Sequence, residues 1–327
     1  MIITKTPFRA SFAGGGTDLP AFYEKEDGMV VSMAINSFVY LAVHRFFENR
    51  IVLKYSETES VEHVDQIRHG LIRECLKIVG VSEPLEITSF ADIPSRGSGL
   101  GSSSAFAVGL ISALQAFKGL PVSPERSAHL ACEVEIGRLG EPIGKQDQYA
   151  AAYGGLNTIT FRADGTVNVE SITLEDEARR HMEEHLVMFY TGLVRSASEI
   201  LSEQKKATES DKDKFALLRD MKSLAAQLRE ELQKGHVDRL GPLMHEGWLM
   251  KKGLAAKISL PEIDAAYEAA MQAGATGGKL LGAGGGGFLL FYCPPSNRAE
   301  LMRRLAPLRA VPIRMELRGS RVAFLES

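Results

Sequence analysis

The chain reads PSRGSGLGSSSA over Pro94–Ala105 and continues directly into an apolar, alanine-containing stretch over Phe106–Phe117. Glycine occupies every second position from Gly97 to Gly101, so the backbone there can adopt left-handed dihedral angles and approach a bound group closely. The stretch that follows has a helical pattern, and the first turn of a helix presents unpaired N–H groups and the positive end of the helix dipole. We therefore interpret residues 94–104, the glycine–serine loop, as a phosphate-binding site.

The loop matches neither of the two commonest nucleotide-binding motifs. A Walker loop needs a lysine directly after its second glycine, but no lysine lies between Arg96 and Lys118. A Rossmann fingerprint has the spacing G-x-G-x-x-G, whereas Gly97, Gly99 and Gly101 form G-x-G-x-G. A flexible linker would have a similar composition, but apolar sequence flanks the loop closely on both sides. The sequence thus predicts phosphate binding in some other fold.

The composition is that of a globular protein. The chain has 327 residues, of which 45% are hydrophobic and 24% charged, and this length is enough for two domains. Its net charge of −3, with dispersed basic residues, argues against nucleic-acid binding. Neither the cysteines (Cys75, Cys132 and Cys293) nor the histidines show metal-ligand spacing, so we expect a reducing compartment and no zinc. Without a signal peptide or a membrane-spanning segment in the sequence, we expect a cytoplasmic protein with no membrane partner.

Strand and helix patterns alternate irregularly along the chain and predict an α+β fold. A charged stretch over Glu175–His185 precedes a new strand, so we place a domain boundary there and predict domains over 1–185 and 186–327. The second half contains a helical stripe of apolar residues from Leu218 to Leu232. It ends in predicted strands over 288–292, 312–317 and 321–325.

Two more glycine-rich segments lie beside predicted strands. Ala13–Asp18 reads AGGGTD, and Gly282–Gly287 reads GAGGGG, which formally satisfies the Rossmann spacing. The second segment runs into the strand pattern of Phe288–Tyr292 instead of opening a helix, which disfavours a dinucleotide-binding dehydrogenase. We expect the three glycine-rich segments to meet around one ligand.

In this order the three segments resemble the three motifs of the GHMP kinase superfamily, small-molecule kinases that include galactokinase, homoserine kinase and mevalonate kinase. The motifs are similar to Pro7–Asp18, the glycine–serine loop and Lys279–Phe288, and together they span nearly the whole chain. The resemblance implies an N-terminal domain like ribosomal protein S5 domain 2 and a ferredoxin-like C-terminal domain, with the active site between them.

Within the superfamily the chain most resembles the D-glycero-D-manno-heptose 7-phosphate kinases. The resemblance rests on Ala13–Leu19, on Pro142–Tyr149, and on His245–Trp248 followed by Lys251-Lys252. Galactokinases differ in the first motif, because they have Glu-His where this chain has Gly15-Gly16.

The resemblance implies that ATP and Mg²⁺ are the cofactors. Phosphoryl transfer needs a phosphate site, a divalent ion and a positioned hydroxyl group. The family pattern gives Ser103 and Glu135 as the magnesium ligands, with Glu133 as the competing carboxylate; a solvated helical glutamate is the structural alternative for either. The residues expected to bind the nucleotide are Pro94, Gly97, Ser98, Gly99, Leu100, Gly101, Ser102, Ser103 and Ser104.

The same resemblance implies two catalytic residues. Asp147 matches the catalytic aspartate of galactokinase-like members and would orient the acceptor hydroxyl and take its proton. Arg9 matches the basic partner that keeps this aspartate ionised and attracts phosphate. The structural alternative for Asp147 is a helix cap.

The substrate is expected to contact the first and third motifs. Thr17 and Asp18 resemble sugar-hydroxyl ligands, although Thr-Asp also suits a turn. A phosphorylated substrate needs a second basic site, for which Lys145, Arg138, Arg195 and Lys279 remain open candidates. The expected substrate-binding residues are Gly15, Gly16, Thr17, Asp18, Lys145, Arg195, Gly284 and Gly285.

Three functions follow from this resemblance. The first is ATP-dependent phosphorylation of the anomeric C1 hydroxyl of D-glycero-D-manno-heptose 7-phosphate, which gives the 1,7-bisphosphate. The second is a sugar 1-kinase that acts on an unphosphorylated sugar such as fucose or galactose. The third, a sugar- and ATP-binding regulator without catalysis, is disfavoured by the presence of the four expected catalytic and metal-binding residues. The expected partners are a sugar phosphate and ATP, and a homodimer is compatible with the sequence.

Overall fold

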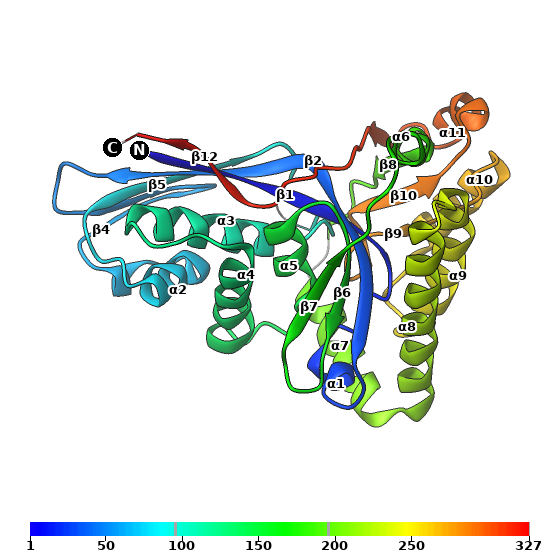
Figure 1. Ribbon diagram of the computed structural model, residues 1–327, viewed down its shortest axis with the longest axis horizontal. Coiled ribbons are helices and arrows are strands. Elements are labelled where there is room, and N and C mark those ends of the chain that lie inside the picture. The colour runs from blue at the N-terminus through cyan, green and yellow to red at the C-terminus, as the bar shows by residue number, and fades with distance from the viewer. Residues whose placement is uncertain (95–96, 195–196, 327) are drawn as a thin grey trace.

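The structure is a computed structural model that describes residues 1–94, 97–194 and 197–326. It contains an eight-stranded sheet and a four-stranded sheet, with helices packed against both sheets (Figure 1). The larger sheet has the order β12-β1-β2-β5-β3-β4, with β6 beside β2 and β7 beside β6. The smaller sheet has the order β11-β8-β10-β9. This mixture confirms the predicted α+β class.

The strands of the larger sheet are β1 (Ile2–Ala13), β2 (Gly28–Arg45), β3 (Ile51–Lys54), β4 (Thr58–Val61), β5 (Leu85–Ala91), β6 (Leu156–Phe161), β7 (Val167–Ser171) and β12 (Arg321–Leu325). Those of the smaller sheet are β8 (Leu186–Tyr190), β9 (Gly277–Leu280), β10 (Phe288–Tyr292) and β11 (Arg309–Val311).

The helices in the first half are α1 (Pro20–Tyr23), α2 (Gly70–Val79), α3 (Ser102–Phe117), α4 (Pro124–Cys132), α5 (Gln146–Tyr153) and α6 (Asp176–His185). Those in the second half are α7 (Ala197–Ser210), α8 (Lys212–Gln233), α9 (Leu240–Lys252), α10 (Pro261–Gln272) and α11 (Arg298–Arg304). Short helical turns are η1 (Val64–Gln66), η2 (Glu133–Arg138), η3 (Val237–Arg239) and η4 (Pro295–Asn297). None of the helices in the described ranges has an apolar stretch that could cross a membrane.

The long strand β2 carries the chain from one part of the larger sheet to another. Its first residues pair with β6, its last residues pair with β5, and β1 pairs along most of its length. The register between β1 and β2 shifts at Pro7/Phe8 and again at Ser11/Ala13, and such irregularities bend a strand pair. The bend carries the end of β1 toward the smaller sheet (Figure 1).

Helix α3 lies under the larger sheet and is surrounded by protein. It is apolar on nearly all sides because the sheet covers one face while α2, α4 and α5 cover the others (Figure 1). Gly109 allows the closest approach, since a Cβ there would lie 2.6 Å from Oγ1 of Thr6 on β1. This packing fixes the N-terminal end of α3, where the glycine–serine loop ends.

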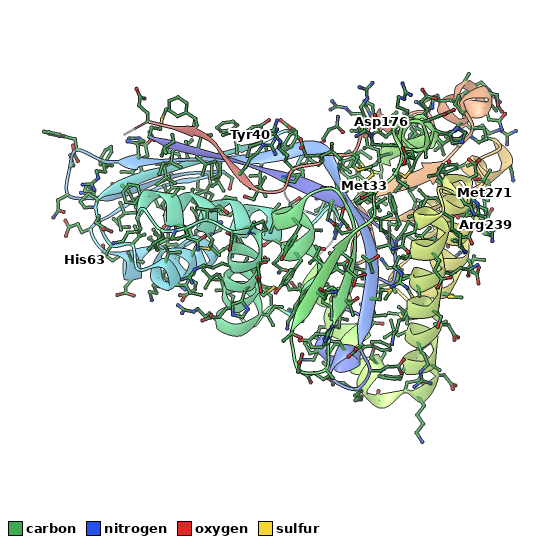
Figure 2. The ribbon with its side chains drawn as sticks, in the orientation of Figure 1. Met33, Tyr40, His63, Asp176, Arg239 and Met271 are labelled. Atoms are coloured by element: carbon green, nitrogen blue, oxygen red, sulfur yellow. The ribbon has the colours of Figure 1, made fainter. Side chains whose placement is uncertain are left out.

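One apolar cluster joins the two sheets. It contains Met33 of β2, Leu228 of α8 and Leu290 of β10, all fully buried, and Figure 2 marks Met33 close to the bend of β2. The predicted stripe from Leu218 to Leu232 is confirmed as buried on α8. The two halves of the chain are therefore held by a shared core.

The end of the chain differs from its prediction. Residues 312–317 form no regular strand; Met315 makes an isolated bridge to Ile35 of β2, and Glu316 N–H bonds to the Ala34 carbonyl. The predicted strand at 312–317 was therefore wrong, because this segment crosses between the sheets. The next segment, β12, pairs with β1 in the larger sheet. The boundary at residue 185 stays a prediction.

Candidate active site

A cavity of about 310 Å³ lies where the three glycine-rich segments meet. Gly15 and Gly16 line it from the first segment, and Gly282 and Ala283 line it from the third. The glycine–serine loop contributes Gly97, Ser98, Gly99, Gly101, Ser102, Ser103 and Ser104. The expectation that the three segments surround one site is therefore confirmed.

The second and third segments touch through their backbones. A Cβ added at Gly282 would lie 2.4 Å from the Cα atom of Gly99, and one at Gly287 would lie 2.4 Å from the carbonyl oxygen of Ser98. Side chains at these positions would separate the two segments, and the φ angles of Gly99 and Gly282 are 72° and 75°, in the left-handed region. The glycines thus bring the two segments into direct contact at the cavity wall.

Arg9 and Asp147 form a bidentate ion pair in the cavity. Arg9 Nε and Nη2 donate to the two carboxylate oxygens of Asp147 at 2.7 and 2.8 Å, and Nη1 donates to the Gly99 carbonyl at 2.6 Å. Arg9 is 3% exposed, whereas the Asp147 side chain is 23% exposed toward the cavity. Two parallel hydrogen bonds fix the plane of the carboxylate. Asp147 is therefore oriented by a buried arginine and open to a ligand.

Glu135 is the most buried acid that lines the cavity. It is 1% exposed, and Ser103 Oγ and Gln148 Nε2 donate to its two oxygens at 2.6 Å each. Burial raises the pKa of Glu135 to about 7, an effect only partly offset by hydrogen bonds from Ser103, Ser104 and Gln148. No lysine or arginine in the described ranges pairs with it. A buried carboxylate beside a serine hydroxyl, with no cation partner, fits a hard divalent cation such as Mg²⁺.

The competing carboxylate lies elsewhere. Glu133 is exposed and pairs with Arg138 at 3.3 Å, and Arg138 also lies 3.7 Å from Glu74. Neither Glu133 nor Arg138 lines the cavity. Of the alternatives left open by the sequence, the geometry favours Glu135 as the cation ligand and excludes Arg138 from the site.

Asp18 sits deep in the wall formed by the first segment. Its carboxylate accepts hydrogen bonds from the backbone N–H groups of Gly16 at 2.9 Å and Gln146 at 3.4 Å. Burial, and then repulsion from Asp147, raise the pKa of Asp18 above its usual range. Because Asp18 is 3% exposed and lines the cavity, a ligand hydroxyl group can reach it.

Thr17 and Lys145 do not line the cavity. The Thr17 hydroxyl is buried and bonded to the backbone of Gly14 and Met29, so it holds the turn, as the structural alternative expected. Lys145 donates to the Gly165 carbonyl at 2.8 Å and lies over the Tyr23 ring, away from the cavity. The expectation that these two side chains contact the substrate is not met by their positions.

Other expected contacts are also absent from the cavity wall. Pro94 is exposed outside it, and the Leu100 side chain is buried in the apolar core, where its carbonyl accepts the backbone N–H of Arg9. Gly284 and Gly285 pack against Ile258. The third segment lines the cavity with Gly282 and Ala283 instead. Arg195 lies outside the described residues.

Six polar residues that line the cavity were assigned no role in the sequence analysis: Ser11, Glu141, Gln146, Ser198, Gln204 and Lys251. The Ser11 hydroxyl, Gln146 Oε1 and Gln204 Nε2 are buried without a hydrogen-bond partner in the structure. Unpartnered buried polar atoms are costly, so their presence on a cavity wall indicates a polar ligand. Ser11, Gln146 and Lys251 belong to segments that carry the family resemblance, although no role was assigned to them, whereas Gln204 lies outside every motif.

Lys251 and Lys279 add positive charge to the cavity. Lys251, on α9, donates to the Gly282 carbonyl, and Lys279, on β9, donates to the Phe12 carbonyl at 3.3 Å. Burial lowers the pKa of Lys251 to about 8, and burial together with the nearby Lys251 and Arg9 lowers the pKa of Lys279. Neither lysine forms an ion pair with a carboxylate of the described residues. Both are therefore available to an anionic ligand.

Comparison with known proteins identifies this architecture. The family model "GHMP kinases N terminal domain" matches residues 66–155, and "GHMP kinases C terminal" matches residues 228–307. A D-glycero-alpha-D-manno-heptose 7-phosphate kinase of Campylobacter jejuni is 30% identical, and the match covers 93% of each chain. A galactokinase of Pyrococcus furiosus is 25% identical over 88% of this chain and 87% of its own.

A solved structure supports the same conclusion. It is titled a D-glycero-D-manno-heptose 1-phosphate kinase from Bacteroides thetaiotaomicron and superposes with a TM-score of 0.82 at 25% identity over the whole of both chains. The fold and the site thus define a small-molecule kinase, a phosphotransferase with an alcohol group as acceptor. The chain belongs to the GHMP kinase family, as the sequence motifs indicated.

Proposed function

We propose that the chain is an ATP-dependent sugar kinase that phosphorylates the anomeric C1 hydroxyl of D-glycero-D-manno-heptose 7-phosphate to the 1,7-bisphosphate. The observation that carries the proposal is the cavity itself, in which Asp147 faces the glycine–serine loop and two buried lysines have no carboxylate partner among the residues that the structure describes. The names of two similar proteins, each a kinase associated with a heptose phosphate, support this choice of substrate.

In the proposed complex the triphosphate of ATP lies along the glycine–serine loop at the start of α3. Backbone N–H groups and the Ser102 and Ser104 hydroxyls would bind its oxygens. Ser103 and Glu135 would hold Mg²⁺, which supplies charge neutralisation for the transferred phosphoryl group when bound. The two oxygen atoms that would bind the ion, Ser103 Oγ and Glu135 Oε1, are already joined by a hydrogen bond of 2.6 Å.

The acceptor hydroxyl would bind Asp147. Fixed by Arg9, the carboxylate orients the hydroxyl toward the γ-phosphate and accepts its proton as the new O–P bond forms. Arg9 donates two hydrogen bonds to the carboxylate and one to Gly99, so its charge also lies beside the phosphate site. Asp18 and Gln204 would bind other hydroxyl groups of the sugar, because both are buried polar side chains on the same cavity wall.

The buried lysines support a substrate that already carries a phosphate. Within the described part of the chain, Lys251 and Lys279 each form one hydrogen bond, to a backbone carbonyl, and both line the cavity. Burying an ammonium group without an anion is unfavourable, and a phosphate in the cavity would remove that penalty. The lysines come from the second half of the chain, whereas the glycine–serine loop comes from the first.

A panel of sugars with Mg-ATP tests the proposed substrate. We expect ADP release with heptose 7-phosphate, with a product carrying a second phosphate on C1, and at least about 100-fold lower kcat/KM for the same heptose without its phosphate. Phosphorus NMR of the product gives the position. Equal kcat/KM for free and phosphorylated sugars would favour the alternative, a fucose- or galactose-type 1-kinase.

Replacing Lys251 with methionine is expected to raise KM for the phosphorylated sugar about tenfold or more and to change kcat less, because a charge-assisted hydrogen bond to phosphate is lost. Lys252→Met is the matched control: its ammonium group pairs with Asp264 at 3.2 Å outside the cavity. Steady-state kinetics of both variants measure KM and kcat for the phosphorylated sugar. An unchanged KM in Lys251→Met would show that this residue does not bind the phosphate.

The pH dependence of the free enzyme provides a related readout. Because the pKa of Lys251 is lowered to about 8, the ammonium form dominates below pH 8 and the neutral amine above it. We expect kcat/KM for the phosphorylated sugar to fall as the pH rises through about 8 in the wild type. In Lys251→Met this alkaline decrease should be absent.

A further inference from the structure

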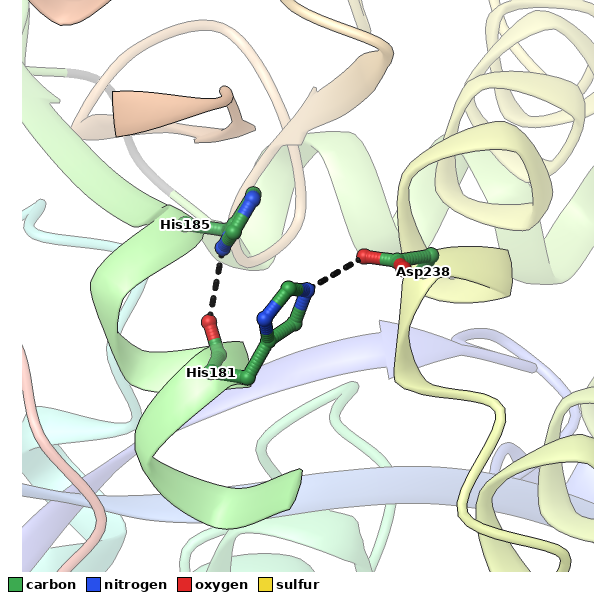
Figure 3. A group of neighbouring side chains, drawn as sticks. All are labelled: His181, His185 and Asp238. Atoms are coloured by element: carbon green, nitrogen blue, oxygen red, sulfur yellow. Dashed lines mark hydrogen bonds and ion pairs between the residues drawn. The ribbon is translucent and has the colours of Figure 1, made fainter. Parts of the chain in front are cut away.

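A group of potential metal ligands lies outside the cavity, at the end of α6. His185 ends this helix, His181 lies one turn before it, and Asp238 approaches them from η3 (Figure 3). His181 Nε2 lies 2.8 Å from Asp238 Oδ1, and the two imidazole rings stack with their centroids 4.2 Å apart. One ligand atom from each residue lies within 4.8 Å of the others. None of the three lines the active-site cavity.

Hydrogen bonds around the group leave metal-binding atoms available. His185 Nδ1 lies 2.7 Å from the His181 carbonyl oxygen, a contact in which Nδ1 carries the proton and Nε2 keeps its lone pair (Figure 3). The Tyr292 hydroxyl donates to Asp238 at 2.9 Å and so orients the carboxylate. Such outer contacts to a backbone carbonyl and a hydroxyl are the kind that orient metal ligands.

The charge of the group also suits a cation. No lysine or arginine of the described residues forms an ion pair with Asp238, whose polar partners are His181 and Tyr292. The ligand set is two imidazole nitrogens and one carboxylate oxygen, which matches the preference of Zn²⁺ and similar transition ions over Mg²⁺. Ligands of a tetrahedral zinc ion lie about 3.3 Å apart for bond lengths of about 2.0–2.1 Å, so small side-chain rotations suffice.

We propose that His181, His185 and Asp238 form a transition-metal site of the Zn²⁺ class, with water completing the coordination. The bound ion would join α6, which links the two sheets, to η3, which precedes α9. Its role would be structural, because it would connect elements that are distant in sequence. This proposal departs from the expectation of no zinc, which rested on spacing along the chain, because the third ligand comes from another part of the chain.

Calorimetric titration of the full chain, without an added histidine tag and after removal of metals with a chelator, tests the proposal. With Zn²⁺ as the probe and excess Mg²⁺ present to occupy oxygen sites, we expect one bound equivalent and a thermal unfolding temperature higher by a few degrees. Each of His181→Gln, His185→Gln and Asp238→Asn should weaken Zn²⁺ binding at least about tenfold. His44→Gln is the matched control, because His44 is a surface histidine near one carboxylate, that of Glu86 at 3.7 Å.

Binding to the wild type should also give the visible absorption bands of tetrahedral Co²⁺ when that ion replaces Zn²⁺, a readout that needs no variant to fold. The proposal is wrong if the wild type takes up no Zn²⁺ saturably, or if all three variants bind it as tightly as the wild type. In that case the group is only a hydrogen-bonded contact between two helical segments. Neither the titration nor the Co²⁺ spectrum requires kinase activity, so the outcome is independent of the proposed function.

Discussion

Replacing Asp147 with asparagine is expected to lower kcat by about 10²–10⁴-fold while leaving the affinity for ATP nearly unchanged. Asparagine has almost the same shape, but its amide cannot accept a proton, and its NH₂ group would face the donors of Arg9. The two hydrogen bonds that now orient the carboxylate, at 2.7 and 2.8 Å, would be reduced to one. The loss therefore concerns both the proton acceptor and its orientation.

ADP release under saturating substrate measures kcat, and calorimetric titration with a non-hydrolysable ATP analogue measures nucleotide binding. Asp220→Asn, on the exposed side of α8, is the control for the same chemical change and should behave as the wild type. Full activity of Asp147→Asn would contradict the assignment of this residue as the base. A variant that also loses nucleotide binding would instead show that the ion pair with Arg9 shapes the phosphate site.

Replacing Glu135 with glutamine is expected to reduce kcat/KM for Mg-ATP by at least about 100-fold. Changing even outer partners of a metal ligand costs about 10–100-fold in affinity, and a direct ligand should cost at least as much. The amide oxygen remains, but the charge that attracts the cation is lost. Varying Mg²⁺ at fixed ATP should show that the variant needs a higher Mg²⁺ concentration, whereas a variant with the wild-type requirement would rule out Glu135 as a ligand.

The same substitution should make the metal-free protein more stable at alkaline pH. The pKa of Glu135 is raised from 4.5 to about 7, so the folded state holds a proton that the unfolded state has released between these values. Its contribution to stability is full below pH 4.5 and is lost as the pH rises through about 7. Glutamine has no charge to bury. At alkaline pH the substitution should therefore raise the free energy of unfolding by up to roughly 3 kcal/mol, the value that corresponds to this pKa shift.

Urea unfolding at pH 8 in the presence of EDTA measures this gain. Glu133→Gln is the control two positions away: its carboxylate is exposed and paired with Arg138, so its removal should change the free energy of unfolding by no more than about 0.5 kcal/mol. A less stable Glu135→Gln would mean that the hydrogen bonds from Ser103 and Gln148 outweigh the cost of burying the charge.

The sequence predicted those parts of the site that depend on the backbone. Three glycine-rich segments met at one cavity because glycines such as Gly99 and Gly282 have a strong local preference for tight turns and close contacts. The α+β class and the buried stripe on α8 followed from periodicity, which is also a local signal.

Side-chain direction was not predictable in the same way. Thr17 and Lys145 adjoin residues that line the cavity, but one turns into a backbone hydrogen-bond network and the other toward Gly165. Lys251 lies in a segment that carries the family resemblance, but its place in the cavity depends on how α9 docks against the sheet, which the sequence pattern does not show. The pairing of β12 with β1 was likewise not predictable, because two strands from opposite ends of the chain leave no local pattern in the sequence.

The return of β12 to the larger sheet bears on any attempt to express the two halves separately. A fragment ending near residue 185 would lack the strand that covers the outer side of β1, where Ile2 faces Leu325. Its N–H and C=O groups would then form a free edge, which invites pairing with a second molecule and aggregation. The last residues of the chain thus protect the first from self-association.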